Sequence, residues 1–332
     1  MNILITGGAG FIGSHLAERL VELGNHVVVL DDLSNGRTDY IQHLQNSPQF
    51  QFVNGSVLDA SLLKPLIEQC DVIYHLAAVL GVKNTVQDPL KVIEGNIDGT
   101  RQILSLAYAH RKKVIFASTS EVYGKNNQLP FHENSDRVLG APSIHRWCYA
   151  TAKALDEHLC FAYSDKGLPV TVVRLFNAYG PRQTYSQYGG VIPRFITAAL
   201  TGKPLTIHGD GSQTRCFTYV DDIVSGLVAT LNPNANGLAF NLGSEFMIAI
   251  RGLANKILQL TGKTVPIQYV PYEEAYGPGF EDTPARIPDL ARSKTILGYH
   301  PSISLDVGLK RTIRWYVDEL GGGGNFVPEK KE

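Results

Sequence analysis

Short apolar runs alternate with longer amphipathic segments along the first half of the chain. The segment 14–23 repeats apolar residues at helical spacing and stands between two of these runs. The run 27–30 is apolar throughout, which is typical of a strand covered by helices on both faces. This alternation predicts βαβ units and a parallel sheet. The predicted strands are 2–6, 26–30, 51–54, 72–75, 114–117 and 170–174.

The pattern loosens after about residue 176, where glycine and proline become frequent. We expect a smaller lobe there, interrupted by a return to the large sheet at 238–242. The predicted fold class is therefore α/β, with a Rossmann-type doubly wound parallel sheet and a smaller C-terminal α+β lobe. The expected boundaries are 1–175 and about 216–245 for the Rossmann domain, 176–215 and 246–318 for the lobe, and 319–332 for a flexible tail.

The composition restricts the partners that this chain can have. It has 332 residues, 44% of them hydrophobic, which is enough for a full core. With 30 basic and 31 acidic residues, it lacks the charge of a nucleic-acid binder or a polybasic membrane anchor, so we expect small-molecule partners. Its four cysteines show no metal-ligand or disulfide spacing, so no metal is expected. Without a signal sequence or a long apolar run, the expected location is the cytoplasm.

A glycine-rich segment, 7–13, lies between the first predicted strand and the first helix. Glycines at such a turn let the backbone approach a pyrophosphate, which then faces the helix N-terminus. Asp31 follows Gly13 by 18 residues, at the end of the second strand, where a carboxylate can bind the ribose hydroxyls of NAD and repel the 2′-phosphate of NADP. NAD is the expected cofactor, although the nearby Arg37 could host that phosphate.

A tyrosine and a lysine, Tyr149 and Lys153, stand four residues apart and so share one face of a helix. The lysine charge is expected to lower the pKa of the phenol, so that a phenolate can take a hydroxyl proton while a hydride leaves the same carbon. Thr119 follows an apolar strand at the sheet edge where such folds bind ligands, and it could share a hydrogen bond with that hydroxyl.

These motifs together resemble the extended short-chain dehydrogenase/reductase family of NAD-dependent nucleotide-sugar epimerases, dehydratases and decarboxylases, over roughly residues 1 to 315. The resemblance implies that Tyr149 is the base, that Lys153 anchors the nicotinamide ribose and that Thr119 assists; Ser120 and Glu121 complete the expected catalytic set. The matching segments are GGAGFIG (7–13), HLAA (75–78), GNIDGT (95–100), STSEVYG (118–124), YATAK (149–153), RLFNAYGPR (174–182), GDGSQTR (209–215) and RIPD (286–289).

The same resemblance implies a tightly bound, recycled NAD and a UDP-sugar substrate. The family commonly has an aspartate at Ser56, so adenine recognition would rest on Ser56 or on the Val57 backbone. The expected cofactor-binding residues are Gly7, Gly10, Phe11, Ile12, Gly13, Asp31, Asp32, Ser34, Gly36, Ser56, Val57, Leu76, Ala77, Ala78, Asn96, Tyr149 and Lys153. The expected substrate-binding residues are Lys83, Thr119, Arg146, Asn177, Arg182, Val191, Thr206, His208, Gln213, Arg215 and Arg286, with Asn177, Arg215 and Arg286 on the diphosphate.

The reaction itself is left between alternatives. Glu121 and Arg146 resemble the UDP-glucuronate decarboxylase branch, whereas the segment 180–193 resembles the 4-epimerases. The sequence favours a UDP-hexose or UDP-hexuronate 4-epimerase, with a UDP-glucuronate decarboxylase that uses Glu121 and Arg146 as the alternative. A 4,6-dehydratase is less favoured, and a non-catalytic NAD-binding protein is disfavoured because Tyr149 and Lys153 are both present. The family also implies a homodimer through a four-helix bundle formed by 89–110 and the helix that carries Tyr149.

Overall fold

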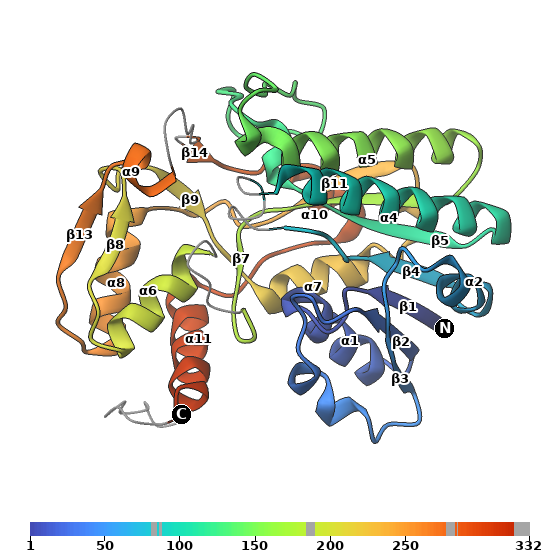
Figure 1. Cartoon of the computed structure of the whole chain (residues 1–332), viewed down its shortest axis with the longest axis horizontal. Coiled ribbons are helices and arrows are strands. Elements are labelled where there is room, and N and C mark those ends of the chain that lie inside the picture. Colours follow the sequence, from blue (N-terminus) through green and yellow to red (C-terminus); the bar gives the residue numbers. More distant parts are fainter. Residues whose placement is uncertain (81–84, 86–87, 184–189, 277–282, 284, 322–332) are drawn as a thin grey trace.

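The structure is a computed structural model that describes residues 1–80, 85, 88–183, 190–276, 283 and 285–321. Its centre is a seven-stranded sheet in which every pairing of neighbours is parallel. The predicted Rossmann-type doubly wound fold is confirmed (Figure 1). In spatial order the strands are β11 (Leu238–Leu242), β6 (Val170–Leu175), β5 (Lys113–Thr119), β4 (Val72–His75), β1 (Asn2–Thr6), β2 (His26–Asp31) and β3 (Phe50–Asn54).

Alternate residues of strand β1 face two different hydrophobic cores. Ile3 and Ile5 point toward α1 (Phe11–Glu22) and α7 (Val220–Ala229), and Leu4 points toward the opposite layer. Figure 1 shows α1 and α7 on one side of the sheet and α4 and α5 on the other. The opposite layer consists of α2 (Ala60–Gln69), α4 (Pro89–His110) and α5 (Cys148–Asp165).

A smaller lobe lies beyond the carboxyl ends of the strands and is formed by residues from the second half of the chain (Figure 1). Strand β8 pairs with β13, and β9 pairs with β12 and β14. Its elements are α6 (Val191–Leu200), β8 (Leu205–His208), β9 (Thr214–Cys216), β12 (Met247–Ala249), α8 (Ile250–Thr261), β13 (Ile267–Val270), α9 (Tyr272–Tyr276) and β14 (Ala285–Arg286).

Several remaining elements connect the sheet to this lobe. Strand β7 (Ala178–Tyr179) pairs with β10 (Thr218–Tyr219), and α11 (Leu305–Glu319) packs on α6 and α8. Helix α10 (Ala291–Leu297) packs beside β11. Short 3-10 helices are η1 (Thr38–Tyr40), η2 (Gln42–Leu44), η3 (Ser120–Tyr123), η4 (His145–Trp147) and η5 (Pro233–Ala235).

The predicted domain boundaries stay a prediction, but the structure refines the last of them. Glu319, the first residue of the expected tail, is instead the last residue of α11 and forms an ion pair with Arg37. Residues 322–332 lie outside the described part of the chain. In that part, no helix is both long enough and apolar enough to cross a membrane.

Candidate active site

The glycine-rich turn between β1 and α1 has no room for larger residues. Gly7 adopts a positive φ of 74°, and its N–H donates to the Leu30 carbonyl at 2.9 Å. A Cβ on Gly13 would lie 2.7 Å from Gly8 Cα and closer still to the Gly7 carbonyl oxygen. Helix α1 begins directly after Gly10, which provides no side-chain cap. The first backbone N–H groups of this helix are therefore available to an anionic group such as a pyrophosphate.

Asp31 connects the end of β2 to this turn. Its two carboxylate oxygens accept hydrogen bonds from the Ala9 N–H at 2.9 Å and from the Leu33 N–H at 2.8 Å. The side chain of Asp32 accepts from the Ser34 N–H, and a Cβ on Gly36 would lie 2.7 Å from Asp31. The predicted residues 31, 32, 34 and 36 thus gather beside the turn, at the end of β2 that a bound adenosine would reach.

Arg37 has partners of its own. Its guanidinium donates to Asp39 and to Glu319, both at 2.8 Å, and lies over the Tyr40 ring. A 2′-phosphate would have to displace these carboxylates. This arrangement supports the sequence-based preference for NAD over NADP.

Two other predicted cofactor residues, Ala77 and Asn96, lie just after β4 and on α4. The Ala77 N–H donates to Thr6 Oγ1, and the Ala77 backbone lies so close to Gly7 that a Cβ there would clash with it. Asn96 is 2% exposed and donates to the Val79 and Val92 carbonyls, while its Oδ1 is buried without a hydrogen-bond partner among the described residues. A buried acceptor of this kind suits a ligand hydroxyl or amide.

The predicted base and its lysine lie at the start of α5. Lys153 is 2% exposed, and its Nζ lies 4.3 Å from the centroid of the Phe116 ring. The expected lowering of the Tyr149 pKa by this lysine is not found in the protein alone. Burial raises the pKa of Tyr149, and the charges of Glu121 and Asp156 raise it further. Burial also lowers the pKa of Lys153.

Strand β5 ends at Thr119 and delivers the remaining predicted catalytic residues. Thr119 Oγ1 accepts from the Glu121 N–H at 3.2 Å, and Ser120 is buried. Glu121 forms ion pairs with Arg146 at 2.8 Å and with Arg286 at 3.4 Å. Burial alone would raise the pKa of Glu121, but the two guanidinium groups outweigh burial and lower it to about 2. Glu121 is therefore an anion at neutral pH.

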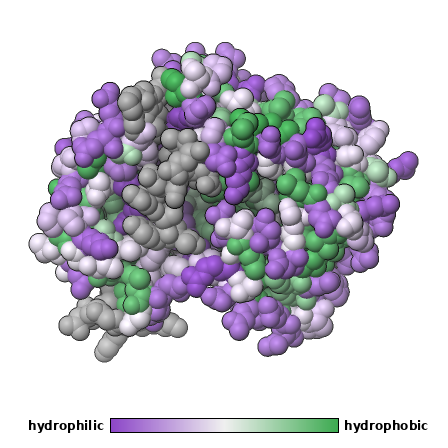
Figure 2. Space-filling view, in the orientation of Figure 1, coloured by the Kyte–Doolittle hydropathy of each residue, from purple (hydrophilic) through white to green (hydrophobic). Residues whose placement is uncertain are grey.

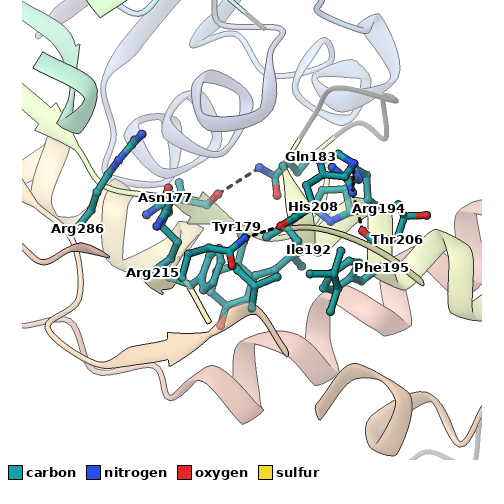
Figure 3. A pocket seen from close by; sticks show the side chains of 18 of the residues that line it. Asn177, Tyr179, Gln183, Ile192, Arg194, Phe195, Thr206, His208, Arg215 and Arg286 are labelled. Atoms are coloured by element: carbon teal, nitrogen blue, oxygen red, sulfur yellow. Dashed lines mark hydrogen bonds between the residues drawn. The ribbon is translucent and has the colours of Figure 1, made fainter. Parts of the chain in front are cut away.

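A cavity of about 310 Å³ opens between the Rossmann sheet and the smaller lobe. Figure 3 shows Arg286, Asn177 and Arg215 toward one end of it, with His208 and Thr206 toward the other. The space-filling view shows this face hollowed between the two parts of the molecule (Figure 2). Nine predicted catalytic or substrate residues line the cavity: Glu121, Arg146, Asn177, Val191, Thr206, His208, Gln213, Arg215 and Arg286.

Tyr272 and Tyr276, which the sequence analysis did not select, also line this cavity. Tyr276 Oη lies 2.8 Å from His208 Nδ1, and Gln213 Nε2 donates to Tyr272 Oη at 2.9 Å. Both tyrosines belong to the five-residue helix α9, which is too short to show a periodic pattern. Their spacing of four residues was the available signal, because it places two aromatic rings on one face.

Two of the predicted substrate residues that the structure describes, Thr119 and Arg182, do not line this cavity. Arg182 adopts a positive φ of 64° and forms an ion pair with Glu18 of α1 at 2.7 Å, so its guanidinium is held by the Rossmann part. This partner stands 164 residues away in sequence, so no local pattern pointed to it. Lys83 lies outside the described residues.

Comparison with known proteins finds relatives that are named as enzymes acting on UDP-sugars. The chain is 50% identical over 313 residues to a UDP-N-acetyl-alpha-D-glucosaminuronate decarboxylase of Bacillus cytotoxicus, an alignment that covers 94% of this chain and 97% of the relative. It is 37% identical over 334 residues to UDP-glucuronic acid decarboxylase 1 of Xenopus tropicalis, with coverage of 99% and 76%.

A solved structure supports the same relationship. The UDP-glucuronic acid 4-epimerase of Bacillus cereus, in complex with UDP-glucuronic acid and NAD, superposes with a TM-score of 0.86 at 32% identity, covering 96% of this chain and all of that one. Residues 3–243 match the model of the NAD dependent epimerase/dehydratase family, which confirms the resemblance inferred from the motifs. The chain therefore belongs to this family and is an NAD-dependent enzyme.

Proposed function

We propose that this enzyme decarboxylates a UDP-hexuronate, either UDP-glucuronate or its 2-acetamido counterpart. The observation that carries the proposal is Glu121 held between Arg146 and Arg286 in the cavity. One carboxylate with two guanidinium groups leaves a net positive charge, which suits an additional anionic group on the sugar. The relatives named as decarboxylases support this choice. They favour the sequence-based alternative over the 4-epimerase that the sequence placed first.

The cavity also provides donors for the nucleotide part of such a substrate. Asn177 and Arg215 lie toward the same end of the cavity as Arg286 (Figure 3). They present an amide and a guanidinium, which are donors that a diphosphate needs. Farther along, His208 and Tyr276 form a hydrogen-bonded aromatic pair. We assign Asn177 and Arg215 to the diphosphate and this pair to the nucleoside end.

The chemistry follows from the catalytic residues. NAD, when bound, supplies the hydride acceptor for C4 of the sugar. Tyr149, as a phenolate stabilised by the Lys153 ammonium, takes the proton from the C4 hydroxyl and becomes a neutral phenol. Once C4 is a ketone, the carboxylate at C6 is β to it, so the C5–C6 bond can break and release CO2 while its electrons pass into an enolate. The enolate then takes a proton from water at C5, which restores the C4 ketone, and C4 regains its hydride while Tyr149 returns its proton to the C4 oxygen. The guanidinium groups hold the sugar carboxylate in place until it leaves as CO2.

A panel of three substrates tests the proposal. We expect UDP-glucuronate, its 2-acetamido counterpart, or both, to lose the mass of CO2, measured by mass spectrometry. UDP-glucose has no carboxylate and is the control for simple epimerisation. Products that are isomers of unchanged mass would overturn decarboxylation in favour of the 4-epimerase. Since the hydride returns to the sugar, no reduced cofactor should accumulate during turnover.

A second prediction concerns the glycine turn, which we propose binds the pyrophosphate of NAD. Gly13→Ala places a Cβ against the Gly7 carbonyl and Gly8, so the turn must open where the pyrophosphate would bind. We expect the affinity for NAD to fall by about tenfold or more, measured by calorimetric titration. Gly252→Ala is the control for replacing a glycine, because Gly252 has no positive φ and a Cβ there would meet only the Ile248 side chain, at 3.4 Å. Equal affinities of Gly13→Ala and wild type would contradict the proposed site.

We also propose that the enzyme is a cytoplasmic homodimer. Helices α4 and α5 pack side by side on the outer face of the sheet and leave large apolar side chains exposed, among them Leu90, Tyr108 and Leu155. Pairing of these two helices with a second copy would cover that surface as a four-helix bundle. Light scattering that gives a monomeric mass would overturn the dimer.

A further inference from the structure

A buried carboxylate lies directly behind the catalytic pair and has no role in the mechanism above. Asp156 is fully buried, on the inner face of α5 and three residues after Lys153. Neither of its carboxylate oxygens has a partner in good hydrogen-bond geometry among the described residues, although the nearby Thr100 hydroxyl helps to stabilise the charged form. Burying a charged carboxylate without good hydrogen-bond donors costs free energy, so a nearby positive charge is needed to stabilise it.

The other charged groups on the same helix do not compensate Asp156. Its neighbour Glu157 is already engaged, because it accepts from Ser118 Oγ at 2.5 Å and from the Arg174 guanidinium at 2.7 and 2.9 Å. Burial raises the pKa of Cys160 well above its usual value, which keeps this thiol neutral. On α5, the cation that interacts with Asp156 is Lys153.

The elements packed against α5 contribute neutral groups. From α4, the Thr100 hydroxyl interacts with Asp156 and lies 3.3 Å from His75 Nε2. Burial and the Lys153 charge lower the pKa of His75 to about 3, so the imidazole on β4 carries no charge at neutral pH. Burial raises the pKa of Asp156 to about 6, and the positive charge of Lys153 opposes that rise, so Asp156 is an anion above about pH 6. The cation that compensates this anion is the ammonium that supports Tyr149.

We propose that Asp156 is a positioning residue that keeps Lys153 charged in its buried site and thereby sets the pH range in which the Tyr149–Lys153 pair works. The inference rests on the proposed roles of Tyr149 and Lys153, and it does not depend on which product is formed. Asp156 acts through Lys153 and touches neither sugar nor cofactor.

The direction of the effect follows from the two opposing influences on Lys153. Burial lowers the pKa of Lys153, and Asp156 is the first of the groups that raise it again. Removing the negative charge therefore lets Lys153 lose its proton at a lower pH. Asp156 also raises the pKa of Tyr149, so its removal moves phenolate formation to lower pH as well. Both the acidic and the alkaline limb of the profile of activity against pH should therefore shift to lower pH.

The test is Asp156→Asn, which keeps the shape of the side chain and removes its charge. The dissociation constant for NAD is measured by calorimetry from about pH 6 to about pH 10, since a neutral amine is a weaker donor to the ribose than an ammonium. We expect the alkaline midpoint, where binding weakens, to fall by about one pH unit. The profile of kcat/KM with a UDP-hexuronate should shift by a similar amount.

Asp165→Asn is the matched control, because it removes an exposed carboxylate from the same helix. Its midpoint should equal that of the wild type. An unchanged midpoint in Asp156→Asn would overturn the proposal, even if turnover or stability fell. If this variant does not fold, Asp156→Ser is measured with the same criterion. Failure to form product in the wild type would count against decarboxylation only, because NAD binding is read independently.

Discussion

Tyr149→Phe is expected to lower turnover of the UDP-hexuronate by about 10²- to 10⁴-fold, because it removes the phenol oxygen that we propose exchanges a proton with the C4 hydroxyl. The affinity for NAD should stay within about threefold of the wild type, since the ring and Lys153 remain in place. Turnover is measured as CO2 release and affinity by calorimetry.

Tyr163→Phe serves as the control. This tyrosine lies farther along the same helix, where its ring packs against Tyr108. It should show the turnover of the wild type. Substantial turnover in Tyr149→Phe, at about a tenth of the wild-type rate or more, would mean that another group removes the proton, and Thr119 at the end of β5 would then be the residue to examine.

Glu121→Gln is expected to slow CO2 release by about 100-fold while leaving NAD affinity unchanged. The amide is neutral, so Arg146 and Arg286 lose the anion that holds them at 2.8 and 3.4 Å, and the carboxylate of the sugar loses its aligned donors. Glu22→Gln is the control, because Glu22 forms an exposed ion pair with Arg19 far from the cavity. Release of CO2 at the wild-type rate would exclude Glu121 from the reaction.

The same residue makes a prediction about pH. The pKa of Glu121 is lowered in the folded protein from 4.5 to about 2. Its charge therefore stabilises the fold fully above about pH 4.5, and this contribution is lost as the pH falls through about 2. We expect the difference in thermal midpoint between wild type and Glu121→Gln to be constant near neutral pH and to shrink below about pH 4.5. A difference that grows on acidification would contradict the ion-pair arrangement.

The fold could be predicted because its signals are local. The apolar strands and the glycine turn are written in consecutive residues, and β1, β4 and β11 begin and end where the pattern placed them. Helix α1 begins three residues earlier than expected, at Phe11, because the glycine turn itself supplies the start of the helix.

The electrostatics of the site could not be predicted in the same way. The partners of Glu121 come from 25 and 165 residues away, so neither its two ion pairs nor its low pKa has a local signature. The direction of the Tyr149 pKa was wrong because burial, which depends on tertiary packing, raises it, and the charges of Glu121 and Asp156 raise it further. Arg182 was assigned to the substrate for the same reason, since Glu18 approaches it only in the folded chain.

Glu121 lies between the Rossmann part and the smaller lobe, and each part contributes one of its two cations. Arg146 reaches it from the Rossmann part, just before α5, whereas Arg286 reaches it from β14 of the smaller lobe. Any outward swing of the lobe would draw Arg286 away and leave the carboxylate with a single cation. If the lobe opened to admit substrate or release product, the sugar carboxylate would then be bound less tightly. Closing of the lobe would restore tight binding. The two parts of the enzyme would thus assemble their full positive charge only when they are together.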